Sequence, residues 1–203
     1  MEDLLAAAGA LVAAALTPGP NNFVVMRAAA RSGLIGALPA IAGIVLGSLA
    51  LLAVVTAGAG AAFEAEPRLE LALAVAGCLY LVYLGIRLLA SGSGSNGEPG
   101  DEGLPAGAAG LFAFQFLNPK SWVLVLTVTA ATPDGDGPLA VFLRLAVLVV
   151  VITTICLLLW SAFGSAMARH LVRRPLRVGL DRTLGALLIA SALLLLTSSW
   201  PEN

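Results

Sequence analysis

Long stretches without a charged residue divide this chain and constrain its fold more than any other feature. Charged side chains make up 11% of the sequence, whereas a soluble domain carries about 25%. A helix that spans a bilayer needs roughly 20 predominantly apolar residues, or about 17 where flanking side chains extend to the interface. The stretches are Leu4–Met26, Ser32–Phe63, Leu71–Ile86 completed by Leu88–Ala90, Gly103–Pro119 continuing past Lys120 to Pro133, Leu145–Ala168 and Thr183–Pro201. We therefore expect an all-α membrane protein with six transmembrane helices and no soluble domain.

A Gly/Ser-rich segment separates the first three predicted spans from the last three. Residues 91–103 have the composition of a flexible linker, which offers conformational freedom and few groups to pack. Because each half holds an odd number of spans, the second half enters the membrane from the opposite side. Residues 1–203 are thus predicted to form one transmembrane domain of two inverted three-helix halves, about 1–90 and 104–203.

The first predicted span is interrupted by the sequence T-P-G-P-N-N at residues 17–22. Proline removes a backbone donor and clashes with the preceding turn, so a break in hydrocarbon survives only where it is buried in protein or lines a cavity. Thr17 is suited to cap the following helix, Pro18 or Pro20 suits its first turn, and its free N–H groups attract an anion. A sealed proline kink is the alternative. The candidate substrate-binding residues here are Thr17, Pro18, Gly19, Pro20, Asn21 and Asn22.

A second interruption, Asn118-Pro119-Lys120-Ser121, falls in the fourth predicted span, which is the first of its half. Broken segments in corresponding positions of two halves indicate a transporter's binding site. Lys120 is the only lysine and has apolar flanks, so it is a candidate to bind a substrate carboxylate or to change protonation during transport. The alternative is an interfacial anchor that snorkels to the cytoplasmic side, beside Trp122 and a helix that Pro119 starts.

Three further polar side chains are candidates for the same cavity. Tyr80 and Tyr83 are three residues apart and occupy neighbouring positions on a helix, where their hydroxyls line the cavity or serve interfacial packing. Gln115 shares a helix face with the second interruption by the same spacing. We include all three among the candidate substrate-binding residues.

Other small or polar residues in the sequence are interpreted as structural. Gly43 and Gly47 have the G-x-x-x-G spacing that lets helix backbones approach closely, and we expect them to pack against the first span. Cys78 and Cys156 are single residues in different spans, and His170 stands alone in a basic loop. This pattern provides neither a redox pair nor a metal cluster, so no cofactor or metal is expected.

The distribution of arginine predicts the orientation in the membrane. Positive charge near short loops stays cytoplasmic, and the connections after the second and fourth spans are acidic or nearly neutral. Both termini should therefore lie outside the cytoplasm, with a first span that is retained because no basic region precedes it. No Asp or Glu falls inside a predicted span, which favours a zwitterionic or neutral substrate. The arginines follow the first, third and fifth spans: Arg27 and Arg31; Arg87; and Arg169, Arg173, Arg174, Arg177 and Arg182.

The motifs taken together resemble those of the LysE/RhtB family of amino-acid exporters. The likeness rests on T-P-G-P-N-N, the glycines of the second span, G-x-x-Y-L-x-Y-L-G-x-R from Gly77 to Arg87, and N-P-K at Asn118–Lys120. It covers essentially the whole chain in order. Members that resemble this sequence, in the threonine, homoserine and leucine efflux branch, export amino acids or derivatives from the bacterial cytoplasm. Carried over by position, the family motif falls on Pro18, Gly19, Pro20, Asn21, Asn118, Pro119 and Lys120.

The resemblance implies a secondary active exporter and not an enzyme. Its expected substrate is a small neutral or zwitterionic amino acid, moved across the bacterial cytoplasmic membrane by proton antiport. Its partners are this substrate, protons and membrane lipid, with no nucleic acid, while a homodimer is left open. The alternatives are a non-transporting helical membrane protein, such as a redox carrier or scaffold, and a metal-ion exporter of related architecture.

Overall fold

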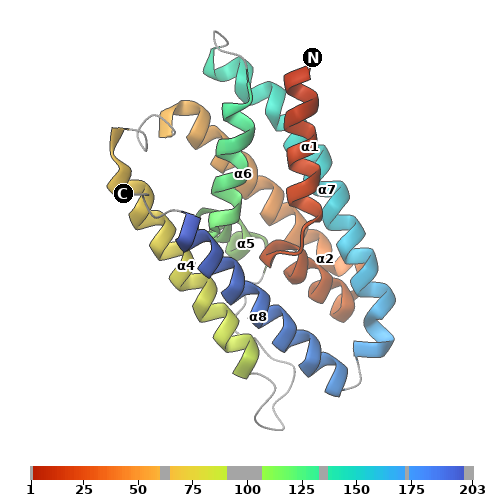
Figure 1. The fold of residues 1–203 in the computed structure, drawn as a ribbon. Coiled ribbons are helices and arrows are strands. Elements are labelled where there is room, and N and C mark those ends of the chain that lie inside the picture. Colours follow the sequence, from red (N-terminus) through yellow and green to blue (C-terminus); the bar gives the residue numbers. More distant parts are fainter. Residues whose placement is uncertain (1, 60–64, 91–106, 133–136, 172–173, 199–203) are drawn as a thin grey trace.

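The computed structural model describes residues 2–59, 65–90, 107–132, 137–171 and 174–198. The regular elements in these ranges are all helices, and Figure 1 shows them gathered into one bundle. The predicted linker at 91–103 and Arg173 of the third basic cluster lie outside the described residues. In chain order the elements are α1 (Glu2–Leu16), α2 (Pro20–Val54), the π-helical turn η1 (Val55–Ala59), α4 (Pro67–Ala90), α5 (Gly107–Leu117), α6 (Pro119–Ala130), α7 (Pro138–Leu171) and α8 (Arg174–Ser198).

The long apolar stretches form helices because a helix satisfies its backbone polar groups internally, as a bilayer requires. Pro20–Gly58 and Pro138–Ala168 are each long and apolar enough to cross a membrane. Helices α5 and α6 meet that test together as one broken span, bent by 67°. Shorter apolar helices cover Ala7–Leu16 and Val75–Ala90. The protein is therefore an all-α membrane protein, and both predicted interruptions separate helices in the structure.

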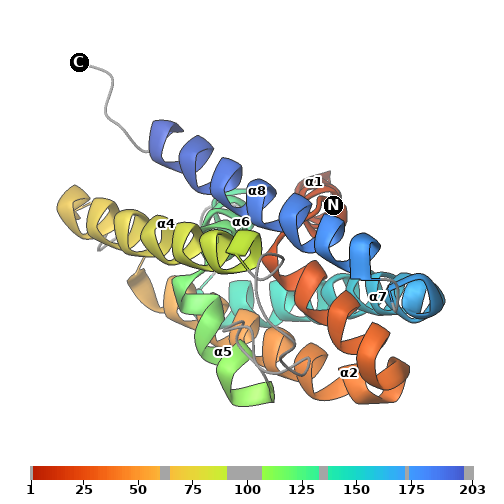
Figure 2. The same ribbon diagram turned by 90° about the horizontal axis from the view of Figure 1, so that it is seen from below.

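A glycine elbow divides α2 into a short arm, residues 20–32, and a long arm, residues 34–54. Gly33 has φ 72° and ψ 179°, a backbone conformation that residues with a side chain rarely adopt. Figure 2 shows the first part of α2 and its continuation running in different directions. The elbow falls between the first predicted span, which ends at Met26, and the second, which begins at Ser32. The short arm thus continues the broken first span beyond the interruption.

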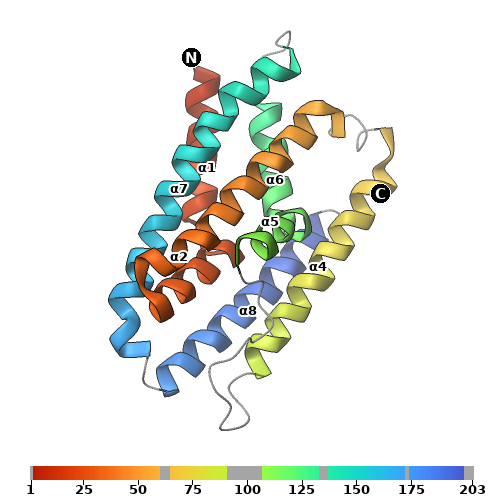
Figure 3. The same ribbon diagram turned by 180° about the vertical axis from the view of Figure 1, so that it is seen from behind.

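Helices from the two halves of the sequence lie side by side. Figures 2 and 3 show α2 along α7 and α4 along α8. A Cβ added to Gly85 of α4 would lie 2.7 Å from the carbonyl oxygen of Gly185 in α8, and the reverse distance would be 2.6 Å. Gly164 of α7 likewise meets the backbone of Met26 in the short arm. These glycines let the backbones of helices from opposite halves approach closely.

The G-x-x-x-G pair of the second span packs against α5, so the predicted contact with the first span is wrong. A Cβ at Gly43 would collide with the backbone of Ala108, and one at Gly47 would lie 2.6 Å from Cγ of Gln115. The spacing identifies a smooth helix face, but the helix that occupies the face depends on the tertiary arrangement. The contact holds Gln115 against the long arm of α2.

A buried ion pair joins the short arm of α2 to α8. Nη1 of Arg27 lies 3.1 Å from Oδ1 of Asp181, and the two side chains are 14% and 6% exposed. Helix α8 begins at Arg174, before the span predicted from Thr183, so Asp181 belongs to an apolar helix. A buried carboxylate requires a partner, which Arg27 supplies. This pairing between distant segments was not predicted from the sequence.

The core consists of two apolar clusters, and both contribute residues to the wall of the cavity described below. The first gathers residues of α2, α4, α5, α7 and α8, including Phe23, Ile44, Leu84, Phe114, Leu157 and Leu188. The second gathers residues of α1, α2, α6 and α7, including Leu11, Leu51, Val125, Leu145 and Val149.

Candidate functional site

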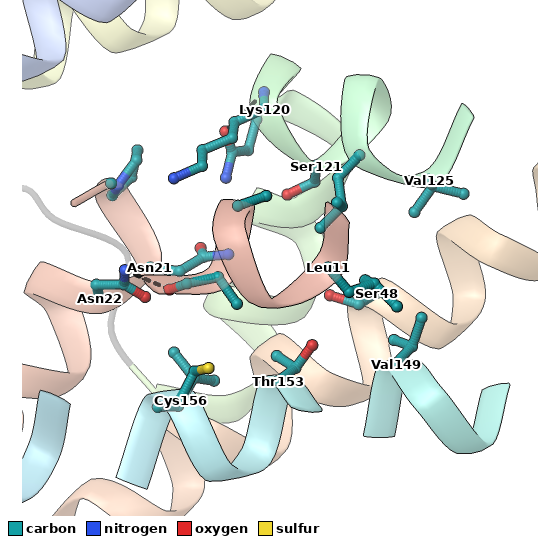
Figure 4. Close-up of a pocket in the computed structure, with 17 residues that line it drawn as sticks. Leu11, Asn21, Asn22, Ser48, Lys120, Ser121, Val125, Val149, Thr153 and Cys156 are labelled. Carbon is teal, nitrogen blue, oxygen red and sulfur yellow. Dashed lines mark hydrogen bonds between the residues drawn. The ribbon is translucent and has the colours of Figure 1, made fainter. Parts of the chain in front are cut away.

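The two breaks lie next to each other in space, although about a hundred residues separate them in sequence. Figure 4 shows Asn21 and Asn22, at the start of α2, facing Lys120 and Ser121, at the start of α6. Contacts between these segments, given below, run directly from side chains of one break to groups of the other. The two interruptions are thus neighbours in the structure, and their role as a binding site stays a prediction.

At the first break the chain is extended and α2 starts without a side-chain cap. Gly19 occupies the N-cap position with φ −164° and ψ 174°, and Pro20 is the first helical residue. Thr17 was predicted to cap this helix, and that prediction is wrong. Its Oγ1 donates instead to the carbonyl of Ala13 at 2.6 Å, because the helix begins three residues later than Thr17. The N–H groups of the first turn of α2 therefore have no side-chain acceptor.

Two carbonyl groups at the first break accept hydrogen bonds from side chains beyond it. Nδ2 of Asn22 donates to the carbonyl oxygens of Ala15 at 2.9 Å and Thr17 at 3.0 Å. Nζ of Lys120 donates to the same Thr17 oxygen at 2.8 Å. A cation at this position also interacts favourably with the negative end of the α1 dipole. The carbonyl groups of Ala15 and Thr17 at the proline-containing break thus have side-chain partners.

The second break is shorter and has a side-chain cap of its own. Pro119 begins α6, as the anchor interpretation of Lys120 expected, and Oδ1 of buried Asn118 accepts from the backbone N–H of Lys120 at 3.2 Å. On the other side of the break, Nε1 of Trp122 donates to the carbonyl of Phe116 at 2.9 Å. The side chains of Asn118 and Trp122 thus partner backbone groups on both sides of the bend.

A buried glutamine connects the two breaks. Gln115 is fully buried, and its amide exchanges two hydrogen bonds with that of Asn21, at 3.1 Å and 3.0 Å. Its Oε1 also accepts from Oγ of Ser121 at 2.8 Å, and its Nε2 donates to the carbonyl of Leu111 at 3.3 Å. Every polar atom of the Gln115 side chain therefore has a partner, which favours a single arrangement of the two breaks.

A cavity of about 60 Å³ lies where the breaks meet. This volume has room for a few water molecules, at roughly 10–15 Å³ each. Lys120 is the one charged residue among those that line it. The apolar part of the wall comes from α1, α6 and α7 and includes Leu11, Leu124, Val125, Val149 and Leu157. The candidate site residues from the sequence that line the cavity are Gly19, Pro20, Asn21, Asn22, Asn118 and Lys120.

The other candidate residues do not line this cavity. Thr17 reaches the site only through its carbonyl, and Gln115 through its bonds to Asn21. Pro18 lies within the first break and Pro119 starts α6, neither of them on the cavity wall. Their predicted contact with substrate stays a prediction.

The two tyrosines lie away from the cavity. Tyr80 packs on the ring of Phe114, with centroids 5.7 Å apart, and stacks on Tyr83 at 6.3 Å. Tyr83 is 49% exposed and accepts a hydrogen bond from Nη1 of Arg87 at 2.8 Å. Their three-residue spacing does place them together, as predicted. A role in substrate binding stays a prediction for both.

Four polar residues of the cavity wall were not assigned to the site from the sequence: Ser48, Ser121, Thr153 and Cys156. Ser121 belongs to the second interruption, and Ser48 follows Gly47, which packs on Gln115. Thr153 and Cys156 are three residues apart on α7 and share a helix face. That spacing is the one sequence signal for them, and Cys156 had been interpreted as a packing residue.

The arrangement favours a small anion or zwitterion over a cation. An ammonium and an uncapped helix N-terminus lie on one cavity, and no carboxylate lines it. Within the part of the chain that the structure describes, no three His, Cys, Asp or Glu residues are grouped so as to hold a metal ion.

Two broken helices whose ends meet at a cavity inside an apolar helical bundle define a membrane transport protein. The chain belongs to the LysE family: the model of the LysE type translocator matches residues 12–199. It is also similar to the uncharacterized membrane protein PA4757 of Pseudomonas aeruginosa, with 27% identity over 196 residues, which cover 91% of this chain and 90% of that protein. No solved structure is significantly similar to this chain.

Proposed function

We propose that this protein is a secondary active exporter of a small neutral or zwitterionic amino acid, of the threonine, homoserine and leucine branch of its family. The observation that carries the proposal is the position of Lys120. Its ammonium lies on the same cavity as the uncapped first turn of α2, and the two come from different halves of the chain. Both attract a carboxylate in an environment of low dielectric.

The rest of the wall fits the remaining parts of such a substrate. Oxygen atoms of Ser48, Ser121 and Thr153 are available as acceptors for an α-amino group. The apolar residues of α6 and α7 suit a short aliphatic side chain. A second positive charge on the substrate would find no carboxylate on this wall, so lysine and arginine are poor candidates.

We further propose that the chain crosses the bacterial cytoplasmic membrane six times, as two inverted halves. The broken spans α1 with the short arm of α2, and α5 with α6, then occupy equivalent places in the two halves. Basic residues follow spans one, three and five, which supports an orientation with both termini outside the cytoplasm. A membrane-impermeant thiol reagent should label Glu66→Cys from outside and spare Arg174→Cys, in a chain whose native cysteines are replaced. Labelling of position 174 from outside, with protection of position 66, would contradict the proposed orientation.

We propose proton antiport as the energy source, so that a proton enters as the amino acid leaves. Lys120 is assigned to the substrate carboxylate as an ammonium. The exchanged proton is not assigned to it, because a lysine that bound the carboxylate only when protonated would carry its proton out with the amino acid, which is symport.

Efflux from vesicles that contain only this protein tests the proposal. Vesicles preloaded with a panel of radiolabelled amino acids should lose threonine, leucine or a similar neutral member faster than protein-free vesicles. A proton gradient directed against the amino-acid flux should accelerate this loss. Failure to export any neutral amino acid, with correctly inserted protein, would overturn the proposed function. Export that ignores the proton gradient would overturn the antiport.

A further inference from the structure

The carbonyl oxygen of Thr17 has two donors, which makes one of them dispensable. Nζ of Lys120 lies 2.8 Å from this oxygen, and Nδ2 of Asn22 lies 3.0 Å from it. A carbonyl at a break within an apolar span requires a partner, and Asn22 supplies one whether or not the lysine is present. Lys120 can therefore leave Thr17 without stranding an unpaired carbonyl.

The glycine at position 19 is explained by the lysine and not by the backbone. Gly19 has an extended conformation, φ −164° and ψ 174°, which any residue can adopt. A Cβ at this position would lie 2.9 Å from Nζ, 3.3 Å from Cδ and 3.6 Å from Cε of Lys120. All three of its nearest neighbours thus belong to one flexible side chain. The missing methyl group provides the space that the ammonium occupies.

We propose that Gly19 is a positioning residue for Lys120. It admits the ammonium to the first break, where the lysine exchanges the Thr17 carbonyl for the carboxylate of a substrate. While bound to Thr17, the lysine joins the end of α1 to the start of α6. When it turns to a substrate, that link between the halves is released, and the amide pair of Gln115 and Asn21 still joins the two breaks. The exchange rests on the proposed function, whereas the positioning role of Gly19 does not.

Acetylation of Lys120 by a small amine-reactive ester tests the positioning role directly. Lys120 is the only lysine, so mass spectrometry of its peptide reports on one side chain. Gly19→Ala should raise the acetylation rate about tenfold, because the added methyl group displaces the ammonium from a charge-assisted hydrogen bond. Asn22→Ala should lower the rate, because Thr17 then depends on Lys120 alone. A site that was merely loosened would react faster in both variants, and that result, or an unchanged rate in Gly19→Ala, overturns the proposal.

A double-mutant comparison separates space from backbone conformation. The loss of melting temperature caused by Gly19→Ala should be smaller when Lys120 is replaced by methionine, because the steric conflict is then relieved. Equal losses in both backgrounds would mean that the backbone itself requires glycine, and the proposal would be wrong. Neither this measurement nor the acetylation of the two variants needs a substrate, so both are independent of the export assay.

The exchange of partners is tested with L-leucine and L-threonine, using their amides as controls without a carboxylate. Whichever of the two amino acids is exported should slow the acetylation of Lys120, and its amide should not. An exported amino acid that leaves the rate unchanged at a concentration that saturates export overturns the exchange. If neither is exported, the exchange with these carboxylates is wrong, while the Gly19 variants still decide the positioning role.

Discussion

The first break leaves residues 17–19 between α1 and α2, whereas the second leaves only Asn118 between α5 and α6. Asn118 caps its own helix with its side chain, while Gly19 offers no cap to α2. The first break instead obtains partners from the second half of the chain: Lys120 for the carbonyl of Thr17 and Gln115 for the amide of Asn21. The second break is thus closed by residues next to it, whereas the first combines its own Asn22 with partners from its counterpart.

This difference assigns different tasks to the two breaks. The second, with a fully buried cap, is suited to hold Lys120 in a fixed place. The first break has uncapped N–H groups at the start of α2, and some of its hydrogen-bond partners belong to the second half of the chain. It is therefore suited to change its contacts when a ligand binds. We expect loss of the Lys120 ammonium to act on binding, and loss of the cap at Asn118 or of the buried amide at Gln115 to act on stability.

Loss of the Lys120 charge should have the largest effect on substrate affinity. Lys120→Gln removes a charge-assisted hydrogen bond worth about 1.5–3 kcal/mol, which corresponds to a tenfold to 150-fold weaker affinity. Lys120→Arg retains the charge but changes its shape and proton affinity, so it should insert normally without restoring full transport. Substrate binding at equal membrane abundance is the measurement. Unchanged affinity in Lys120→Gln would leave the first break as the main anion-binding element.

Replacement of Gln115, whose side chain joins the two breaks, should have the next largest effect. The property that it should change is stability. Gln115→Leu leaves Asn21 and Ser121 without their partner in a buried site, at a cost of about 1–3 kcal/mol per unsatisfied group. Adding Asn21→Leu should recover part of this loss, because both partners of the amide pair are then apolar. Denaturant unfolding in detergent measures both variants. Strictly additive losses would mean that the amide pair does not join the breaks energetically.

The smallest effect is expected at the cap of the second break. Asn118→Ala removes an N-cap hydrogen bond and should reduce the free energy of unfolding by about 0.5–2 kcal/mol. Affinity, measured on the folded fraction, should change less than in Lys120→Gln. A loss of affinity as large as that of the lysine variant, at unchanged stability, would reverse the roles given to the two breaks.

The sequence located both breaks because proline and glycine inside apolar stretches leave a local signal. It also singled out Asn21, Gln115 and Lys120 as separate candidates. Their mutual contacts could not be predicted, since they depend on how distant helices are placed. The same limit explains why Gly43 was assigned the wrong neighbour and why the pairing of Arg27 with Asp181 was missed. Local sequence patterns thus predict helix faces and helix breaks. Which other helix packs against each of them depends on the tertiary structure.

The native Cys156 offers the most direct test of the central claim that the cavity between the two breaks holds the substrate. Its buried thiol lines the cavity, whereas Cys78 donates to the carbonyl of Ala192 elsewhere in the bundle. The rate at which a small neutral thiol reagent modifies each cysteine can be followed with and without the amino acid that the vesicles export fastest, with Cys156→Ser as the control. We predict that this amino acid slows modification of Cys156 over the concentration range that saturates export and leaves Cys78 unaffected. An exported amino acid that protects Cys78 instead, or leaves Cys156 equally reactive, would contradict the account.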